Sequence, residues 1–189
     1  MLRNVVLAVA GLALVAAGSA AAQEKAAEKP QAKTLAPGTY AHFVTNHGEF
    51  KVRLMPDKAP NTVANFVGLA QGTLDPATGK PGKSKPYYNG LTFHRIAPNF
   101  VVQGGSPGAN EYVGTARYMR DEVGLPHLRG AVGISTRGRD RGDAQIFVNL
   151  VDNPRFDHEY TVFAQVLNGM EVVDRILEGD VIDDVEILP

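Results

Sequence analysis

The alternation of apolar and polar positions predicts a domain made of short β-strands. Within residues 49–54, Phe50, Val52 and Leu54 alternate with charged residues, so one face of this strand is buried and the other meets water. Residues 40–45 precede it, and the Asn-His-Gly sequence between the two segments is typical of a hairpin turn. Apolar runs bounded by turn residues predict further strands at 91–96, 100–102, 131–135, 146–150, 161–166 and around 185–187.

Two segments carry the period of an amphipathic helix instead. The first begins at Pro60, repeats apolar residues at every third or fourth position up to Ala70, and ends before Gly72. A shorter helix is predicted to follow Gly169 and to end at Gly179. About eight short strands with one early and one late helix favour an antiparallel barrel or sandwich over a parallel α/β sheet.

The first 22 residues have the pattern of a secretory signal peptide. Arg3 supplies a positive head, residues 5–17 are apolar and uncharged, and small residues end the segment at Ala22. We expect cleavage after Ala22 and export to the periplasm or, as an alternative, secretion. An uncleaved membrane anchor is the other interpretation, but the apolar run is shorter than the ~20 residues that a spanning helix needs.

The remaining chain is expected to form one domain behind a linker. Residues 23–37 are polar, rich in alanine and interrupted by two prolines, which predicts a flexible linker. Residues 38–189 have a length typical of a single domain. We expect a monomer that has no contact with the membrane once the signal peptide is removed.

Composition and charge exclude several classes of function. The chain contains no cysteine, which excludes disulfides, thiol catalysis and cysteine-ligated zinc. Its net charge is −1, and removal of Arg3 with the signal peptide makes this −2. A protein that binds nucleic acid needs a basic face, so this balance argues against nucleic acid as a partner.

Two polar residues interrupt the apolar stretch 93–105, which reads as a strand, a Pro-Asn turn and a second strand. Strand alternation places Arg95 on the same face as Phe93. An arginine among aromatic and aliphatic side chains needs a partner or a role, although taken alone it is most simply a residue at a sheet edge. Gln103 is the second polar residue of the stretch.

This stretch and five further motifs, in order along the chain, resemble the cyclophilins, the cyclophilin-type peptidyl-prolyl cis/trans isomerases. The resemblance covers essentially all of residues 38–188 and implies a mainly β fold, a closed eight-stranded antiparallel β-barrel capped by two α-helices. The motifs are Ala59-Pro60-x-Thr62-x-x-Asn65-Phe66, Tyr88-Asn89-Gly90, Phe93-His94-Arg95-Ile96 with Asn99-Phe100-Val101-Val102-Gln103-Gly104-Gly105, Gln145-Ile146-Phe147-Val148-Asn149, Tyr160-Thr161-Val162-Phe163 and Gly169-Met170-x-Val172-Val173-Asp174.

The resemblance implies a catalytic role for Arg95. Twisting an Xaa-Pro amide ends the conjugation that gives the bond its barrier near ~20 kcal/mol, and leaves the prolyl nitrogen more basic. A hydrogen bond from a guanidinium to that nitrogen therefore strengthens as the bond twists, which is differential binding of the transition state. No nucleophile, metal or cofactor is required.

Further site residues follow from the family's positions. Phe100 and Gln103 join Arg95 as catalytic residues, since Phe100 forms the floor of an apolar proline pocket and Gln103 bonds the substrate backbone. The substrate-binding residues implied by the resemblance are Val101, Thr136, Gln145, Phe147, Phe156 and Tyr160.

Three features depart from the family's pattern. Ile134-Ser135-Thr136 replaces the usual Met-Ala-Asn or Met-Ala-Arg, which leaves the backbone of Thr136 to hold substrate. Arg155 stands where the family has tryptophan or phenylalanine, unless the register is shifted by one to Phe156. Because cyclosporin uses an indole there, we do not expect tight binding of that drug. The loop 137–143 is rich in arginine, and either favours acidic residues near the substrate proline or neutralises itself.

The expected function is isomerisation of Xaa-Pro bonds during the folding of exported proteins, with unfolded or flexible proline-containing polypeptides as partners. The alternative is a non-catalytic chaperone or peptide-binding module on the same fold. A barrel that carries apolar ligands would leave Arg95 and Gln103 without a role. Arg141-Gly142-Asp143 spells an integrin-binding tripeptide by chance, the five histidines lack metal-ligand spacing, and no helix follows Gly104-Gly105 to bind phosphate.

Overall fold

The structure is a computed structural model that describes residues 39–189. The expected signal peptide, residues 1–22, and the expected linker, residues 23–37, lie outside the described residues. Between residues 39 and 189, no helix has the length and apolar character needed to cross a membrane.

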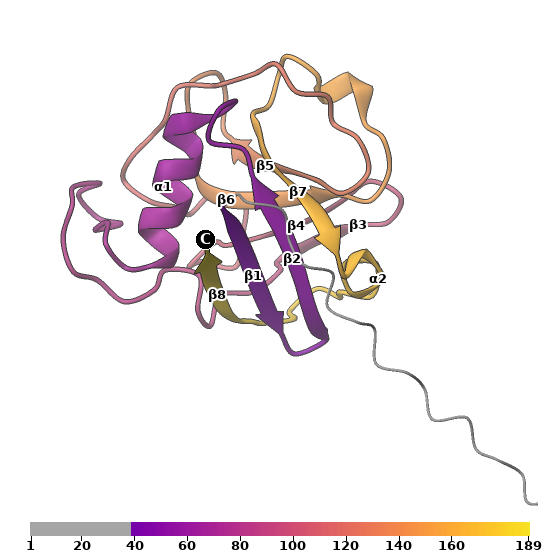
Figure 1. The fold of residues 1–189 in the computed structure, drawn as a ribbon, viewed down its shortest axis with the longest axis horizontal. Coiled ribbons are helices and arrows are strands. Elements are labelled where there is room, and N and C mark those ends of the chain that lie inside the picture. Colours follow the sequence, from indigo (N-terminus) through magenta and orange to yellow (C-terminus); the bar gives the residue numbers. More distant parts are fainter. Residues whose placement is uncertain (1–38) are drawn as a thin grey trace, which may run out of the picture. The chain divides into compact units, whose positions relative to one another are not determined.

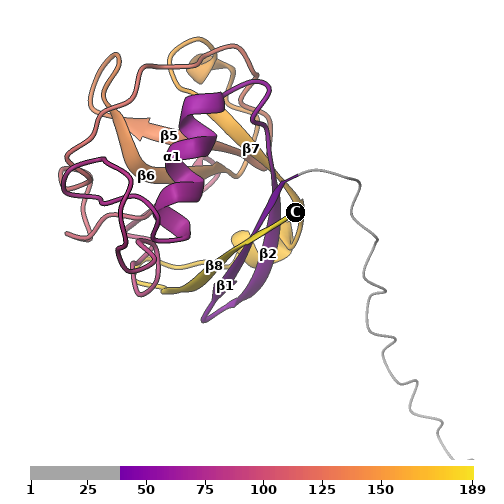
Figure 2. The same cartoon turned by 60° about the vertical axis from the view of Figure 1, so that its left-hand side comes forward.

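Eight strands form one sheet in which all hydrogen-bonded neighbours are antiparallel. Figures 1 and 2 show this sheet curving around α1 (Pro60–Ala70). The strand order across the sheet is β3-β4-β6-β5-β7-β2-β1-β8. The strands are β1 (Tyr40–Thr45), β2 (Gly48–Leu54), β3 (Arg95–Ala97), β4 (Val101–Gly104), β5 (Ala131–Thr136), β6 (Gly142–Asn149), β7 (Val162–Asn168) and β8 (Ile182–Leu188).

The edge strands β3 and β8 do not pair with each other as a ladder. The segments in front of them are joined instead, since Phe93 N donates to Asp180 O at 2.8 Å and Ile182 N donates to Leu91 O at 2.8 Å. The predicted mainly β fold, with eight antiparallel strands and two helices, is confirmed. The predicted closed barrel is not confirmed: within the described residues the two edges are joined by backbone hydrogen bonds between residues 90–93 and 179–182 and not by a strand ladder.

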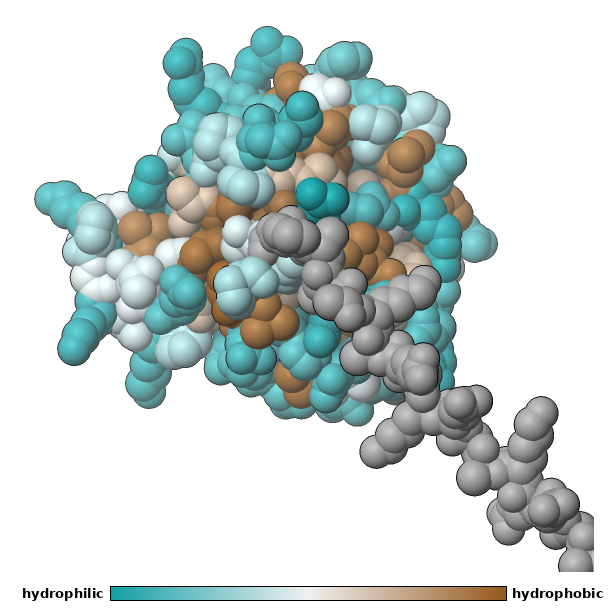
Figure 3. All heavy atoms as spheres, viewed as in Figure 1, coloured by the Kyte–Doolittle hydropathy of each residue, from teal (hydrophilic) through white to brown (hydrophobic). Residues whose placement is uncertain are grey.

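Helix α1 supplies the centre of the core through one aromatic ring. The ring centroid of Phe66 lies 5.1 Å from that of Tyr88 and 5.2 Å from that of Phe163. Phe43 and Phe50, opposite each other on β1 and β2, stack with centroids 4.6 Å apart. In the face drawn in Figure 3, hydrophilic residues make up most of the outline and apolar residues gather towards the middle. Burial of these rings is the main source of stability available to a domain without disulfides.

The N-terminus of α1 is capped by a carboxylate from a distant segment. Glu122 accepts backbone hydrogen bonds from Asn61 N at 3.0 Å and Thr62 N at 2.9 Å, and it also accepts from both side chains. Burial raises the pKa of Glu122, but these four hydrogen bonds outweigh burial and lower the pKa below its usual value. The contact fixes the segment around Glu122 against the helix.

The strand predicted at 91–96 is wrong in its extent, because β3 begins only at Arg95. Phe93 precedes the strand and belongs to the core, whereas Arg95 is 38% exposed, so the two residues do not share a face as predicted. Alternation holds only within a regular strand. The predicted turn is confirmed: Phe100 N donates to Ala97 O at 3.1 Å, and Asn99 adopts a φ of 56°, which asparagine tolerates.

Two short helical segments complete the chain. They are the 3₁₀ turn η1 (Pro154–Phe156) and α2 (Met170–Val173), which is shorter than the helix predicted between Gly169 and Gly179. The turn η1 brings Phe156 to the side of the sheet that carries Phe147, where ring centroids of the two residues are 5.7 Å apart.

Candidate active site

Three predicted site residues lie in one row across neighbouring strands. Arg95 on β3 is directly opposite Gln103 on β4, and Gln103 is directly opposite Phe147 on β6. Residues paired across antiparallel strands project from the same face of the sheet. The register therefore sets a cation, an amide and an aromatic ring side by side.

These residues line a cavity of about 570 Å³. Five further predicted site residues line the same cavity: Phe100, Val101, Thr136, Phe156 and Tyr160. The rings form a wall in edge and tilted contacts, with Phe147 and Tyr160 centroids 5.8 Å apart and Phe156 and Tyr160 centroids 4.6 Å apart. Val101 is 2% exposed and contributes an aliphatic side. A rigid apolar wall of this kind suits a small saturated ring.

Two residues that the sequence did not indicate support this wall. Gly133 on β5 lies opposite Phe147, and a Cβ there would come within 2.4 Å of the ring carbon Cζ. His127 is 1% exposed and stacks on Phe147, with centroids 5.7 Å apart and planes 13° apart. Its Nε2 lies 3.1 Å from Tyr160 O. Burial lowers the pKa of His127, although the hydrogen bond to Tyr160 and the charge of Asp157 oppose this.

The guanidinium of Arg95 is held along one edge. Its Nε lies 3.0 Å from Glu111 Oε1, and its Nη1 donates to Gln103 Oε1 at 3.4 Å. Gln103 in turn donates through Nε2 to Ser135 Oγ at 3.1 Å and to Gln145 Oε1 at 3.0 Å. In the hydrogen bonds from Arg95 through Gln103 to Gln145, each donor therefore meets an acceptor.

Gln145 does not line the cavity, unlike the other predicted site residues. It is 1% exposed and lies behind Gln103. Its Nε2 donates to Asn110 O at 3.2 Å and to Val113 O at 2.8 Å, so it fixes the segment that carries Glu111. The structure places Gln145 as a support for the site.

Arg155 places a planar cation against the aromatic wall. Its guanidinium carbon lies 4.2 Å from the centroid of Phe100, within the range of a cation–π contact. Phe156 contacts Phe100 from the cavity side, with centroids 5.1 Å apart. The ring and the cation occupy different places, so both Arg155 and Phe156 border the cavity.

The arginine-rich loop is partly neutralised within itself. Arg137 Nη2 lies 2.5 Å from Asp143 Oδ2, and the Asp143 side chain is 2% exposed. Asp143 Oδ1 also accepts from Ala144 N at 2.6 Å. A buried, paired aspartate cannot be presented to a partner, so the tripeptide 141–143 is not available to an integrin.

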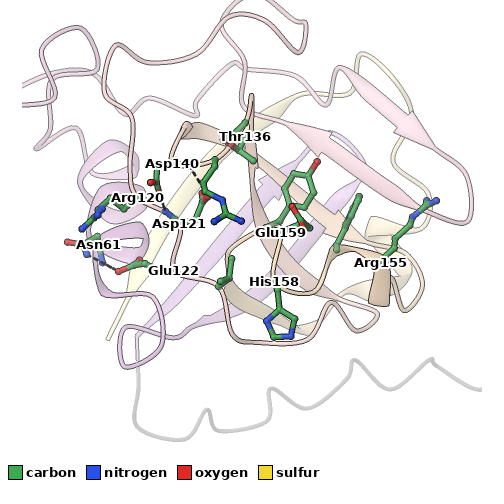
Figure 4. Close-up of a pocket in the computed structure, with 14 residues that line it drawn as sticks. Asn61, Arg120, Asp121, Glu122, Thr136, Asp140, Arg155, His158 and Glu159 are labelled. Atoms are coloured by element: carbon green, nitrogen blue, oxygen red, sulfur yellow. Dashed lines mark hydrogen bonds between the residues drawn. The ribbon is translucent and has the colours of Figure 1, made fainter.

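A second cavity, of about 750 Å³, adjoins the first and shares Thr136, Arg155, Phe156 and Tyr160 with it. Figure 4 shows it with Asn61 and Arg155 at opposite ends. Asp121 and Asp140 join its two sides, because each accepts the backbone N–H of the other, at 2.8 and 2.9 Å. The shared residues make the two cavities one continuous surface.

Sequence reasoning missed Glu111, Tyr112 and Ser135 at the first cavity. The first two lie in the irregular segment between β4 and β5, where no periodicity exists to place a side chain. His94 is 8% exposed and does not line the cavity, and burial lowers its pKa. Within residues 39–189 no group of three His, Cys, Asp or Glu side chains is arranged to hold a metal.

Comparison with known proteins agrees with this geometry. The family model described as "Cyclophilin type peptidyl-prolyl cis-trans isomerase/CLD" matches residues 40–189. A peptidyl-prolyl cis-trans isomerase of Helicobacter pylori is 36% identical over 156 residues, covering 80% of this chain and 88% of that protein. Peptidyl-prolyl cis-trans isomerase B of Bacillus subtilis is 33% identical over 150 residues, covering 77% of this chain and 96% of that protein.

Solved structures agree in fold. The crystal structure of a cyclophilin type peptidyl-prolyl cis-trans isomerase of Cryptosporidium parvum has a TM-score of 0.69 at 22% identity, covering 80% of this chain and 98% of that chain. The crystal structure of the same protein in the presence of the dipeptide Ala-Pro has a TM-score of 0.68. With the family model and the relatives, this likeness shows that the chain belongs to the cyclophilin-type peptidyl-prolyl cis-trans isomerases and is an isomerase.

Proposed function

We propose that this isomerase rotates Xaa-Pro bonds in the first cavity, with the proline ring against Phe147 and Phe100 and with Arg95 facing the prolyl nitrogen. The observation that carries the proposal is the cross-strand row of Arg95, Gln103 and Phe147. In this row a permanent cation stands beside an apolar pocket. That is the combination that a twisting prolyl amide requires.

The chemistry follows from what each group binds. An apolar wall holds the proline ring while the preceding carbonyl turns about the C–N bond. As the amide twists, its nitrogen gains basicity and accepts a hydrogen bond from the guanidinium more strongly than the planar ground state does. Gln103 donates through Nε2 to Gln145 and accepts from Arg95, so it keeps the guanidinium beside the pocket. Thr136, at the end of β5, offers backbone groups to the substrate chain.

The substrates that we propose are unfolded or flexible polypeptides, reached after export of the enzyme as a monomer. Continuity between the two cavities supports a chain that extends beyond the proline. A fold neighbour crystallised in the presence of Ala-Pro supports the same class of ligand. The signal-like residues 1–22 are the basis for export and for a role in the folding of exported proteins.

A non-catalytic peptide-binding module would need only the aromatic wall. The Glu111–Arg95 ion pair and the buried amides behind it favour catalysis, because a simple binding pocket has no need of a fixed guanidinium beside the proline site. The test is exchange of a short Xaa-Pro peptide followed by NMR with purified residues 38–189. We expect cis/trans exchange far above the uncatalysed rate, which is one event in tens to hundreds of seconds. Binding without acceleration would leave only the peptide-binding module.

A further inference from the structure

We propose that Glu111 is a positioning residue, which orients the Arg95 guanidinium for the prolyl nitrogen. This inference rests on the proposed catalytic role of Arg95. Glu111 Oε1 lies 3.0 Å from Arg95 Nε, and the two side chains are 50% and 38% exposed. Both residues line the first cavity, so the pair is formed at its mouth.

The planar geometry of the guanidinium explains how the contact with Glu111 can orient Arg95. Arginine presents five N–H groups in a rigid plane, one on Nε and two on each terminal nitrogen. Glu111 Oε1 forms an ion pair with Nε at 3.0 Å, and Gln103 accepts from Nη1 at 3.4 Å. Two contacts at different atoms fix both the position and the plane of the group. Within residues 39–189 no group accepts from Nη2, so both of its N–H groups are left for a substrate.

A free arginine at this exposure would sample several rotamers. Its neighbours limit this only in part. Gln103 accepts from Nη1 at 3.4 Å, and the guanidinium carbon lies 6.0 Å from the centroid of the Phe100 ring, at the outer limit of a cation–π contact. Among the described residues Glu111 is the one that forms an ion pair with Arg95. Orientation of the catalytic group therefore depends on a residue outside the strands.

Glu111 lies in a turn that is held by its own hydrogen bonds. Asn110 Oδ1 accepts from Tyr112 N at 2.8 Å and from Val113 N at 3.1 Å, which closes the backbone around Glu111. Ser106 Oγ donates to Val113 O at 2.7 Å. The turn thus has a fixed shape in a segment that has no strand or helix.

The same turn is tied to the catalytic amide. Gln145 Nε2 donates to Asn110 O and Val113 O, while Gln145 Oε1 accepts from Gln103 at 3.0 Å. One buried side chain therefore sets the distance between Glu111 and Gln103, the two residues that hold Arg95. This shared anchor distinguishes the contact from an incidental surface ion pair.

A competing interpretation is that Glu111 slows catalysis. A carboxylate beside Arg95 partly neutralises the guanidinium and competes with the substrate for its N–H groups. At half-exposed side chains water screens this attraction, so we infer that orientation outweighs neutralisation. The two interpretations predict slower and faster catalysis, respectively, when the carboxylate is removed.

The experiment measures kcat and KM by NMR exchange on an uncharged Xaa-Pro peptide, with Glu111→Ala, Glu111→Gln and the unchanged protein. We expect Glu111→Ala to lower kcat/KM about fivefold, the upper end of what a half-exposed ion pair contributes, with the change in kcat because the oriented guanidinium acts in the transition state. Glu111→Gln keeps a polar oxygen of the same reach beside Arg95 and should restore most of the rate. Glu178→Ala, which removes an exposed carboxylate with no contact to Arg95, is the matched control and should leave kcat unchanged.

Several outcomes would overturn the role of Glu111. Faster catalysis by both variants would show that the carboxylate competes with substrate. Equal losses in Glu111→Ala and Glu111→Gln would show that charge, not position, matters, and unchanged kinetics in Glu111→Ala would remove the role altogether. If Glu111→Ala lowers the thermal midpoint, recovery of kcat by Glu111→Gln still decides the matter. Lack of catalysis in the unchanged protein would instead contradict the proposed function itself.

Discussion

Gly133 and Phe147 lie opposite each other on β5 and β6, and the ring of Phe147 covers the α-carbon of Gly133. A Cβ at Gly133 would lie 2.4 Å from Cζ and 2.8 Å from Cε1 of the ring. Because the backbone of both strands is held by the sheet, only the ring can move. The missing side chain at Gly133 therefore sets the position of the wall against which we place the substrate proline.

Replacing Gly133 by alanine should displace the Phe147 ring towards the cavity. We expect a loss of stability of about 1–3 kcal/mol from overpacking, and a larger proportional loss of isomerase activity. Chemical unfolding and peptide exchange measure the two effects. Gly82→Ala is the control, because a Cβ there meets no atom closer than 3.9 Å. Equal stability and equal activity of the two variants would show that the Phe147 ring can accept a Cβ at position 133 without moving, which would contradict this prediction.

Arg95→Ala should abolish most of the catalysis without unfolding the domain. Arg95 is 38% exposed and does not belong to the hydrophobic core, so the thermal midpoint of the variant should stay close to that of the unchanged protein. We expect kcat/KM to fall on the order of 100-fold, as for loss of one preorganised transition-state donor. Arg95→Lys should recover little, because an ammonium lacks the planar fork. Arg53→Ala, on the exposed face of β2, serves as the control. Parallel losses of activity and midpoint would make Arg95 a structural residue.

Activity should be constant across neutral pH. The proposed mechanism transfers no proton, and burial lowers the pKa of both His94 and His127, so these imidazoles are neutral at and above pH 7. The measurement is the exchange rate of one peptide over this pH range at constant ionic strength. A bell-shaped profile centred in this range would show that a titrating side chain takes part.

Stability should fall when the solution is acidified, in part because of His127. Its Nε2 lies 3.1 Å from Tyr160 O and its Nδ1 lies 3.3 Å from Asn149 Nδ2, an arrangement that fits the neutral imidazole with hydrogen on Nε2. The pKa of His127 is lowered in the folded state, so the unfolded state binds a proton first. The contribution of neutral His127 to the free energy of unfolding is therefore fully present above about pH 6.5. Below that pH the free energy of unfolding declines by at most about 1.4 kcal/mol per pH unit.

His127→Gln tests this assignment by removing the titrating group. We expect the variant to be less stable at pH 8, because it loses the stack on Phe147, but to have a shallower decline between pH 6.5 and pH 5. Urea unfolding at several pH values gives both quantities. An unchanged slope in His127→Gln would assign the acid sensitivity to other groups.

Cyclosporin should inhibit this enzyme weakly, and Arg155→Trp should increase its affinity. We expect Arg155 to occupy the family position whose indole the drug uses, and its guanidinium lies 4.2 Å from the Phe100 centroid. An indole at this position would keep a stack on Phe100 and offer an N–H donor. Inhibition of peptide exchange by increasing cyclosporin measures the difference. Tight inhibition of the unchanged protein would mean that Arg155 does not substitute for the indole in the way we expect.

Several parts of the site could be predicted from sequence because they depend on local pattern. The Pro98-Asn99 turn joins two short strands and so sets Arg95 opposite Gln103. Both are polar residues in an otherwise apolar stretch, which is what drew attention to them in the sequence. Phe147 was predicted as a pocket residue only through the resemblance to the family, because a place in a buried strand by itself indicates ordinary core. The extent of β3 was wrong, because the residues before Arg95 are held by the segment before β8, a contact across more than eighty residues that no local pattern records.

The sequence by itself determined the mainly β character, the first helix, the hairpin around Arg95 and the family motifs that name the pocket residues. Only the tertiary structure decided that Glu111 meets Arg95, that Gln145 supports the site from behind, and that Gly133 makes room for Phe147. The physical reason is the range of the forces involved. Turns and alternation act between neighbours in the chain, whereas ion pairs and ring contacts join residues that approach only when the sheet has curved around its core.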